Sequence, residues 1–396
     1  MQAMTPINLL HVFSTFATGG PQVRLAAMAN YWGKKYRHTI IAMDGVYDCA
    51  EKFDPSVEYE LHRLDFTKGA TRENIITFWK HLNNWRPDLL LTYNFGAVEW
   101  LLANFFAQHP HIHIEDGFGP DEADGRQLPR RVWLRRAGML FGKHLVVPSN
   151  TLYELATKNW LLPERKISFI PNGIDCERFA GGRTDPEGPL FARHDDEIVI
   201  GTLGALRPEK NLPRLVRAFS MLEGFPNARL VIAGSGPSGE DAKRQAQELG
   251  ISERVTFTGH VAKPERAYKL FDIYALSSDT EQMPLGMLEA MAAGLPVAAV
   301  DVGDVKRMLP LECTPYVYGC FDDELAKSIT QLCADAALRK TLGAANASHA
   351  RKHYSLARMC DAYDALFTRW SRDSMLVQSE IGWGRLMQAV KRTRPG

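Results

Sequence analysis

The sequence predicts an α/β protein made of two domains, each built on a parallel sheet. Its 396 residues exceed what a single hydrophobic core usually serves. Along most of the chain, short apolar runs alternate with segments of helical spacing, which is the rhythm of βαβ units. A strand, a glycine turn and a helix open each half, near residues 7 and 197, as expected at the start of a doubly wound sheet.

The composition argues against several classes of function. The formal net charge is +1 at pH 7, which gives no global electrostatic reason to expect a nucleic-acid partner. The six cysteines are scattered without a Cys-x-x-Cys pair, so we expect core residues in a reducing compartment rather than a zinc cage or a redox motif. Because no secretory h-region opens the chain and no apolar stretch could span a bilayer, we expect a cytoplasmic protein that could touch the inner face of the cytoplasmic membrane.

Strands and helices alternate through the first hundred residues. Ile7–Phe13 reads as a buried strand, a polar loop with Gly19 and Gly20 follows, and Val23–Tyr31 has helical spacing. The loop lacks a full Gly-x-Gly-x-x-Gly pattern, so a tight strand-to-helix turn is the alternative to a ligand-binding one. The same rhythm predicts strands over 38–43 and 87–92 and helices over 74–85 and 97–108.

A short strand over 111–114 runs into a glycine turn that carries two acids, Glu115 and Asp116. Ligands in doubly wound folds sit beyond the carboxyl ends of the strands, so both acids are candidates for a cleft. His111 and His113 alternate with isoleucines, and ordinary strand surface is the alternative to a functional role for them. A metal site is not expected, because no further ligand stands at a recognisable spacing.

A basic segment follows. Its arginines surround the apolar residues 132–134, and they are Arg126, Arg130, Arg131, Arg135 and Arg136. The segment could lie on an anionic membrane or receive a phosphate-bearing acceptor. The alternative is a solvated face paired with Asp121, Glu122 and Asp124. The basic, amphipathic end of the chain, residues 383–394, offers the same choice between a membrane surface and a solvated tail.

The first domain is expected to end near residue 180. Residues 145–150 and 166–170 read as strands, with a helix between them that ends at about Asn159. Asn172 and Gly173 form a turn, and the polar stretch 181–186 reads as a linker. We therefore assign residues 1–179 to the first domain and residues 180–371 to the second.

The second domain opens on a strand over 197–203 that leads into a turn with Gly204, Arg207 and Lys210. An arginine and a lysine three residues apart at a strand end would neutralise a diphosphate, and a solvated basic turn is the alternative. Two further strand-and-turn units follow over 228–236 and 255–261, with Gly234, Gly236, His260 and Val261 in their turns.

The chain is organised around residues 277–297, which begin where an apolar strand over 273–276 ends. Glu281 lies in the turn, Met283-Pro284-Leu285-Gly286 leads into a helix, and Glu289 lies inside that helix. Free N–H groups at a helix N-terminus can hold an anion. The arrangement would suit a nucleotide sugar, with its diphosphate at the turn and its hydroxyls on the carboxylates. The alternative is a buried helix that Glu281 merely caps.

This stretch closely resembles the Glu-x7-Glu element of retaining glycosyltransferases with the GT-B fold, in particular family 4. Glu281 and Glu289 have the required spacing, and residues 289–297, Glu-Ala-Met-Ala-Ala-Gly-Leu-Pro-Val, match the usual sequence of the family at this place. The glycine turns at 19–20, 204–211 and 234–237 occur in the same order as the corresponding turns of the family. Three positions depart from the family: Gln22 stands where Glu often follows Gly-Gly, Glu115-Asp116 replaces His-Asp, and residues 282–286 replace Phe-Gly.

The resemblance implies a GT-B fold, in which two Rossmann-like domains face each other across a central cleft. The first would bind the acceptor and the second the nucleotide-sugar donor, and residues from about 372 to 396 could pack back onto the first. The implied reaction is retaining transfer of a sugar from a nucleotide-diphosphate sugar to a hydroxyl acceptor. The expected acceptor is a lipid-linked glycan or a glycolipid of cell-surface polysaccharide synthesis. No metal or other cofactor is expected, since no acidic cluster such as Asp-x-Asp is present. A nucleotide-sugar epimerase and a non-catalytic nucleotide-sugar-binding protein are the alternatives.

The resemblance also implies roles for single residues. Arg207 and Lys210 would hold the diphosphate, while Glu289 would bind the ribose and Glu281 the sugar hydroxyls. The expected catalytic residues are Asp116, Arg207, Lys210 and Glu281, and the acceptor-side candidates are Glu115 and Asp116. The expected donor-binding residues are Gly19, Gly20, Gly204, Arg207, Lys210, Gly234, Gly236, His260, Val261, Glu281, Met283, Pro284, Leu285, Gly286 and Glu289.

Overall fold

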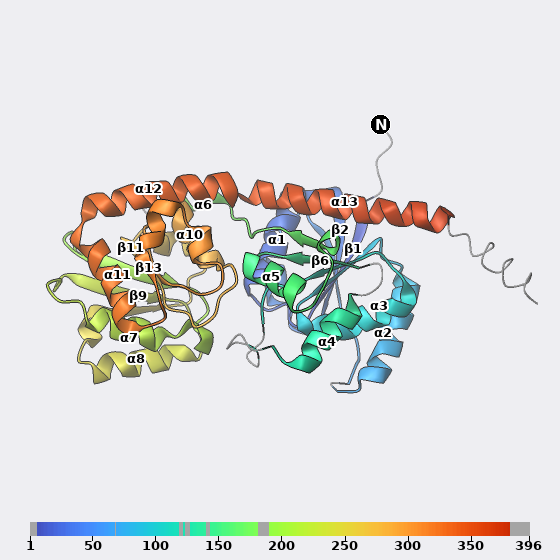
Figure 1. The fold of residues 1–396 in the computed structure, drawn as a ribbon, viewed down its shortest axis with the longest axis horizontal. Coiled ribbons are helices and arrows are strands. Elements are labelled where there is room, and N and C mark those ends of the chain that lie inside the picture. The colour runs from blue at the N-terminus through green and yellow to red at the C-terminus, as the bar shows by residue number, and fades with distance from the viewer. Residues whose placement is uncertain are drawn as a thin grey trace, which may run out of the picture.

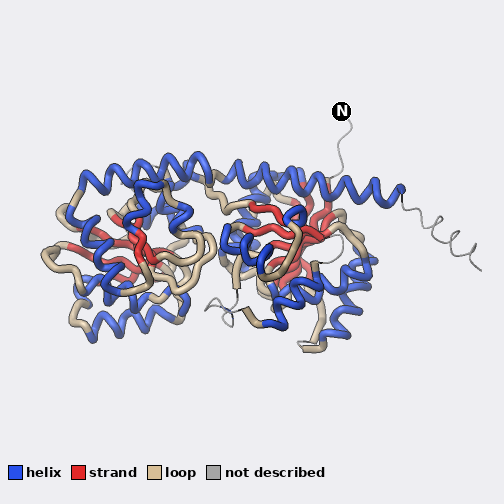
Figure 2. Tube along the Cα trace, viewed as in Figure 1, coloured by secondary structure: helices blue, strands red, loops and turns tan. Residues whose placement is uncertain are grey.

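The computed structural model describes residues 6–67, 69–118, 122, 127–139, 143–180 and 190–380. Within these ranges it forms two α/β domains, each a parallel sheet with helices on both of its faces (Figures 1 and 2). The predicted fold class is therefore confirmed.

The first domain contains a seven-stranded parallel sheet with the strand order β3-β2-β1-β4-β5-β6-β7. The strands are β1 (Ile7–Phe13), β2 (Tyr36–Ala42), β3 (Glu58–His62), β4 (Leu89–Tyr93), β5 (His111–Ile114), β6 (Lys143–Val147) and β7 (Ile167–Phe169). Its helices are α1 (Gly20–Trp32), α2 (Thr71–Trp85), α3 (Val98–Ala107), α4 (Pro129–Gly138) and α5 (Asn150–Lys158). The strand order reverses between β1 and β4, and ligands bind beyond the carboxyl ends of strands at such a switch point.

The second domain contains a six-stranded parallel sheet with the order β10-β9-β8-β11-β12-β13. Its strands are β8 (Ile198–Leu203), β9 (Ala228–Ala233), β10 (Val255–Gly259), β11 (Ile273–Leu276), β12 (Val297–Val300) and β13 (Val317–Tyr318). The helices are α6 (Cys176–Phe179), α7 (Leu212–Ser220), α8 (Ser238–Glu248), α9 (Pro264–Tyr268), α10 (Leu285–Ala292), α11 (Asp322–Ala334) and α12 (Ala336–His353). Here the switch point lies between β8 and β11. Strand β8 leads into the turn with Arg207 and Lys210, called the basic turn below, and β11 leads into Glu281.

Burial explains why the central strands were readable from sequence and one edge strand was not. All residues of β4, β6, β11 and β12 are buried, because helices cover both faces of each sheet, and such strands appear as continuous apolar runs. In contrast, β3 is an edge strand with four exposed residues out of five and no apolar run.

The chain passes between the domains at two adjacent places. The Ile174 N–H donates to the Tyr354 carbonyl at 2.9 Å, and the Leu356 N–H donates to the Ile174 carbonyl at 2.7 Å. Ile174, Cys176 and Phe179 already pack into the core of the second domain, so the change of domain comes before the expected division at residue 180.

The last helix, α13 (Leu356–Glu380), continues beyond α12 along the first domain (Figure 1). Met359, Cys360, Tyr363 and Phe367 are buried in the core of that domain. The return to the first domain therefore begins at Leu356 and not at about residue 372, where it was expected. Residues 381–396, including the basic end of the chain, lie outside the described residues.

Candidate active site

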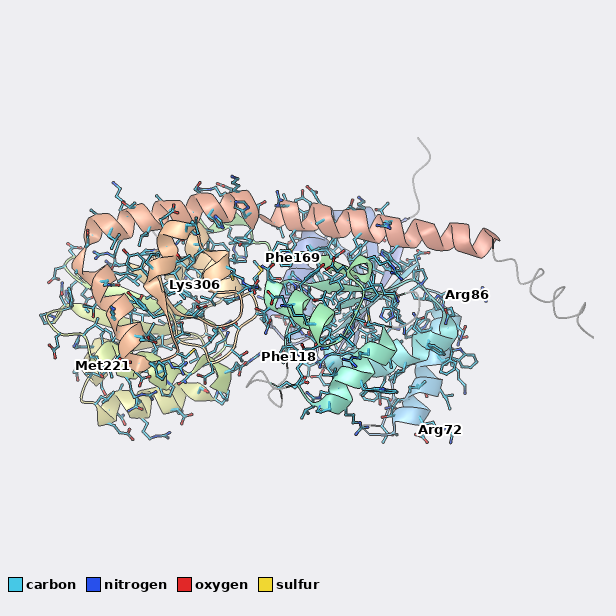
Figure 3. The ribbon with its side chains drawn as sticks, in the orientation of Figure 1. Arg72, Arg86, Phe118, Phe169, Met221 and Lys306 are labelled. Atoms are coloured by element: carbon cyan, nitrogen blue, oxygen red, sulfur yellow. The ribbon has the colours of Figure 1, made fainter. Side chains whose placement is uncertain are left out.

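A cleft of about 1310 Å³ lies between the domains, lined by loops that follow β1, β4 and β5 on one side and β8, β9 and β11 on the other. Phe118, which lines it, is on the side of the first domain that faces the second (Figure 3). Most of the predicted site residues line this cleft. They are Gly19, Gly20, Asp116, Gly204, Arg207, Lys210, Gly234, His260, Val261, Glu281, Met283, Pro284, Leu285, Gly286 and Glu289.

Glu115 does not reach the cleft, contrary to its prediction as an acceptor-side candidate. It is fully buried, with one carboxylate oxygen 3.0 Å from His113 Nε2 and the other accepting from Arg135 Nη2 at 3.1 Å. Burial alone would raise the pKa of Glu115, but the hydrogen bond with His113 and the charge of Arg135 outweigh burial and lower it. Of the two acids after β5, only Asp116 faces the cleft.

The histidines of β5 are buried rather than on strand surface. Thr92 Oγ1 lies 2.7 Å from His111 Nε2 and 2.8 Å from His113 Nδ1. Together with Glu115 and Arg135 they form a buried polar chain that ties β5 to α4, next to Asp116.

Gly236 also lies outside the cleft lining, and it packs against the backbone of the basic turn. A Cβ atom on Gly236 would lie 2.5 Å from the Leu206 carbonyl oxygen, and that oxygen accepts from the Ser238 N–H at 2.9 Å. Gly234 is similarly close to Gly204, whose N–H donates to Ala233 at 3.1 Å. These glycines let the turn after β9 hold the turn after β8 in place.

Arg207 projects from the basic turn toward the first domain. Its side chain is 54% exposed, and the nearest acid that pairs with it is Glu209 at 3.8 Å. Its Nη2 atom lies 3.8 Å from where a Cβ atom on Gly19 would stand. The guanidinium is therefore available to a ligand between the two glycine turns.

Lys210 and Glu281 form an ion pair at the cleft wall. The same oxygen of Glu281 accepts from Ser278 Oγ at 2.8 Å, and Ser277 Oγ donates to the Lys210 carbonyl at 2.9 Å. The end of β11 therefore fixes the first acid of the Glu-x7-Glu element against the cation of the basic turn. Two residues for which the sequence implied separate roles are in direct contact.

Helix α10 begins at the cleft. Its first N–H groups have no acceptor within the helix, and the cap residue Pro284 offers no side-chain acceptor. Gly286 is needed for close packing, because a Cβ atom there would lie 3.0 Å from Tyr274 Oη and 3.1 Å from the Leu203 carbonyl oxygen. The helix terminus is thus held directly beside the end of β8, with donors free to bind an anion.

Glu289 lies one turn further along α10 and lines the cleft. Its Oε2 atom accepts from Tyr268 Oη at 2.8 Å. Burial raises the pKa of Glu289 to about 7, although the hydrogen bond from Tyr268 and the charge of Arg178 act in the opposite direction.

Arg24, which sequence reasoning missed, connects the two walls of the cleft. Its guanidinium binds both carboxylate oxygens of Asp116, at 2.9 Å for Nη2, and donates to Asn172 Oδ1 at 2.8 Å. Asn172 Nδ2 then donates to the Met283 carbonyl at 2.9 Å. Burial would lower the pKa of Arg24, but Asp116 outweighs it and keeps the guanidinium charged. The only signal in the sequence was an arginine among the apolar positions of α1.

The basic segment around α4 is mostly paired within the protein. Arg135 is buried between Glu115 and Glu122, Arg131 pairs with Glu122 at 3.3 Å, and Arg136 donates to the Asn159 carbonyl. This agrees with the paired-face alternative for these arginines. Arg126, Asp121 and Asp124 lie outside the described residues. In the described part of the chain, no helix is both long and apolar enough to cross a membrane.

The described residues contain no group of three His, Cys, Asp or Glu side chains that could hold a metal ion. The charged side chains that line the cleft include Arg207, Lys210, Glu281, Glu289 and Asp116.

Two family models match the chain, one in each domain. The model described as glycosyltransferase family 4 matches residues 18–178, and the model described as glycosyl transferases group 1 matches residues 190–349.

Curated relatives match part of the chain. The D-inositol 3-phosphate glycosyltransferase of Mycolicibacterium smegmatis is 32% identical over 223 residues, which are 52% of this chain and 48% of that protein. A GDP-mannose-dependent alpha-(1-6)-phosphatidylinositol monomannoside mannosyltransferase of Mycobacterium tuberculosis is 31% identical over 198 residues, or 46% of this chain and 51% of that protein. The matched region thus spans about half the length of these relatives.

Solved structures share the whole architecture. HepE of Anabaena in complex with UDP superimposes with a TM-score of 0.75 at 17% identity, over 92% of this chain and 100% of that one. A glycosyltransferase of Rickettsia africae superimposes with a TM-score of 0.74 at 16% identity, over 92% and 98%. At these identities the likeness shows the fold.

The fold, the two family models and the glycosyltransferase relatives agree: the chain belongs to the GT-B glycosyltransferases, with a family 4 match in its first domain and a group 1 match in its second.

Proposed function

We propose that the protein transfers a sugar, with retention of configuration, from a nucleotide-diphosphate sugar to a hydroxyl acceptor. The observation that carries this proposal is the contact between Lys210 and Glu281 beside Arg207 and the N-terminus of α10. Cations, free helix N–H groups and a carboxylate meet there at one wall of the cleft. That combination suits a diphosphate joined to a sugar.

In the proposed donor complex, Arg207 and Lys210 bind the diphosphate and compensate its charge as it departs. Lys210 would turn from Glu281 to the phosphate, which leaves Glu281 to accept hydrogen bonds from sugar hydroxyls. Glu289 would accept from the ribose hydroxyls. We further propose that this compensation makes a metal ion unnecessary, so that chelators leave the transfer unchanged.

Retention is proposed to proceed on one face of the sugar. The bond between the anomeric carbon and the leaving phosphate oxygen breaks, and the acceptor oxygen bonds to that carbon on the same face. The acceptor proton passes to an oxygen of the departing phosphate. Asp116 is bound on both oxygens by Arg24, which favours a positioning role for it over that of a nucleophile.

The proposed acceptor is a hydroxyl of a lipid-linked glycan or a glycolipid, bound by the first domain. Support comes from two relatives with lipids in their names, a phosphatidylinositol monomannoside mannosyltransferase and an alpha-monoglucosyldiacylglycerol synthase. A uridine nucleotide is one candidate for the donor, since two structural neighbours hold UDP or UDP-glucose. A lipid acceptor would place the protein at the inner face of the cytoplasmic membrane.

A screen of UDP-, GDP- and ADP-sugars tests the proposal, with melting temperature and nucleotide release as readouts. A bound donor stabilises the folded protein by mass action. Transfer predicts slow hydrolysis without acceptor and a product of the donor's own anomeric configuration. An epimerase would release a C2 epimer or a free sugar with the nucleotide and need no acceptor, and a binding protein would be stabilised without any turnover.

A further inference from the structure

Asp304 of the second domain places its carboxylate at the N-terminus of α5 in the first domain. Oδ2 accepts from the Asn150 N–H at 2.6 Å and from its Nδ2 at 3.0 Å. Oδ1 accepts from the Thr151 N–H at 2.9 Å and from its hydroxyl at 2.7 Å. Asp304 is 3% exposed, so its carboxylate is largely shielded from water. A carboxylate is the group that the unpaired N–H donors and the dipole of a helix N-terminus favour.

Helix α5 already has a cap of its own. Ser149 Oγ accepts from the Leu152 N–H at 3.1 Å and also donates to Gln282 Oε1 of the second domain at 3.0 Å. The first turn of α5 is therefore bound by its own serine and by two residues from across the domain boundary. A helix that only needed a cap would not require Asp304.

The backbone around Asp304 supports the segment 281–283, which holds the donor-side acid. The Asp304 N–H donates to the Gln282 carbonyl at 3.2 Å. Gly303 has a φ of +56°, and a Cβ atom on it would lie 1.8 Å from the Glu281 carbonyl oxygen. Asn172 holds the other end of the segment through the Met283 carbonyl. Glu281 thus sits in a segment held on one side by Gly303 and Asp304 of its own domain and on the other by Asn172 of the first domain.

We propose that Asp304 is a positioning residue: by capping α5 it clasps the two domains together and sets the segment 281–283 against the first domain. Asp304 does not line the cleft, so it acts through its neighbours and not on a substrate. The conformational part of the proposal is independent of the proposed function. The consequence for nucleotide binding rests on that function.

Asp335 provides a matched control, because it makes the same kind of contact without crossing between domains. It caps α12 by accepting from the Leu338 N–H at 2.9 Å, within the second domain. Asp304→Ala and Asp335→Ala each remove one helix-capping carboxylate, and only the first removes the clasp.

Small-angle X-ray scattering of the ligand-free full chain tests the clasp. Asp304→Ala should increase the radius of gyration, while Asp335→Ala should match the wild type. Thr151→Val, which removes one hydroxyl from the other side of the clasp, should shift the profile in the same direction by less, and it serves if Asp304→Ala does not fold. Scattering profiles of Asp304→Ala or, in its place, Thr151→Val that superimpose on the wild type would overturn the proposal.

Titration with UDP tests the consequence for binding. Asp304→Ala should raise the dissociation constant of UDP about tenfold, Asp304→Asn should recover part of the loss, and Asp335→Ala should bind as the wild type does. Equal affinities of Asp304→Ala and wild type would overturn the positioning role. If the wild type itself does not bind UDP, the failure belongs to the proposed donor, and the scattering experiment alone decides on the clasp.

Discussion

Arg24 binds both carboxylate oxygens of Asp116 through a guanidinium group whose side chain is 2% exposed. The two residues come from α1 and from the end of β5, which are joined only in the folded domain. Because Arg24 also reaches Asn172, and Asn172 reaches Met283, an acid on the acceptor side is connected to the donor side by three hydrogen-bonded contacts. A substitution at Asp116 should therefore alter the position of Met283, and a substitution at Met283 should alter the position of Asp116.

Replacing Arg24 with Ala should remove most of the transfer activity and lower stability. Breaking a buried ion pair by removing one partner costs about 3–5 kcal/mol, because it leaves the other charge buried without compensation. Arg24→Lys keeps the charge without the two-point geometry, so it should recover stability more than activity. Turnover and urea unfolding would be measured beside Arg37→Ala, which breaks an exposed pair with Glu60. Normal turnover in Arg24→Ala would contradict the positioning role of the pair.

Replacing Lys210 with Ala should lower turnover by about 10²- to 10³-fold, the loss typical of removing a group that stabilises developing charge. The folded protein should tolerate the change, because the side chain of Lys210 is 32% exposed. Steady-state kinetics would be compared with Lys243→Ala, which removes a surface cation paired with Glu240 on α8. Equal turnover in the two variants would contradict the role of Lys210 in stabilising the departing diphosphate.

Glu289 should make stability depend on pH. Its pKa is raised from the ordinary 4.5 to about 7, so between these values the folded state holds a proton that the unfolded state has released. The contribution of Glu289 to stability is therefore present below about pH 4.5 and is lost as the pH rises through about 7. Glu289→Gln, which stays neutral, should melt with the wild type at pH 5 and above it at pH 8. Glu253→Gln, at an exposed position, should leave the melting temperature unchanged at both pH values. If the difference in melting temperature between Glu289→Gln and the wild type is the same at pH 5 and at pH 8, the raised pKa is contradicted.

Arg135 should contribute to the stability of the fold through its buried ion pairs, and it should not contribute to the surface charge. Arg135→Ala leaves Glu115 and Glu122 without their shared cation, and we expect a loss of about 3–5 kcal/mol in unfolding free energy. Arg130, which is exposed on the same helix, is the control, and Arg130→Ala should cost less than about 1 kcal/mol. Chemical denaturation measures both, and equal costs would show that the buried network is not what holds α4.

Gly303→Ala should impair donor binding more than a comparable glycine substitution elsewhere. Both Gly303 and Gly224 have positive φ, so an alanine is strained at either position. Only at Gly303 would the new methyl group meet a neighbour, the Glu281 carbonyl oxygen, since nothing lies within 4 Å at Gly224. Nucleotide affinity should therefore fall in Gly303→Ala and stay unchanged in Gly224→Ala. A similar affinity in both would mean that the position of Glu281 tolerates a shift.

Local patterns and the family resemblance predicted the fold, and most of the predicted site residues line the cleft. Buried parallel strands appear as apolar runs, and the residues just beyond them converge at one edge of each sheet, so Arg207, Lys210 and Glu281 could be placed near one another from the sequence. The sequence could not show that Lys210 and Glu281 touch, because that depends on how the turns after β8 and β11 pack.

What escaped prediction depends on contacts between distant parts of the chain. Glu115 and Asp116 are neighbours, and only the buried partners of Glu115 on β5 and α4 decide which of them faces the cleft. Arg24 and Asp304 find their partners in other elements or in the other domain, and no spacing in the sequence records that. The early return of the chain at Leu356 was likewise hidden, because the core residues against which α13 packs lie in distant elements of the first domain.

The most direct test of the central claim is nucleotide release from UDP-, GDP- and ADP-sugars by the wild type and by Lys210→Ala, with melting temperature followed in parallel. We predict that at least one donor raises the melting temperature of the wild type and is slowly hydrolysed, and that Lys210→Ala releases its nucleotide at least about a hundredfold more slowly. The absence of both stabilisation and hydrolysis with every one of these donors would contradict a nucleotide-sugar site in this cleft.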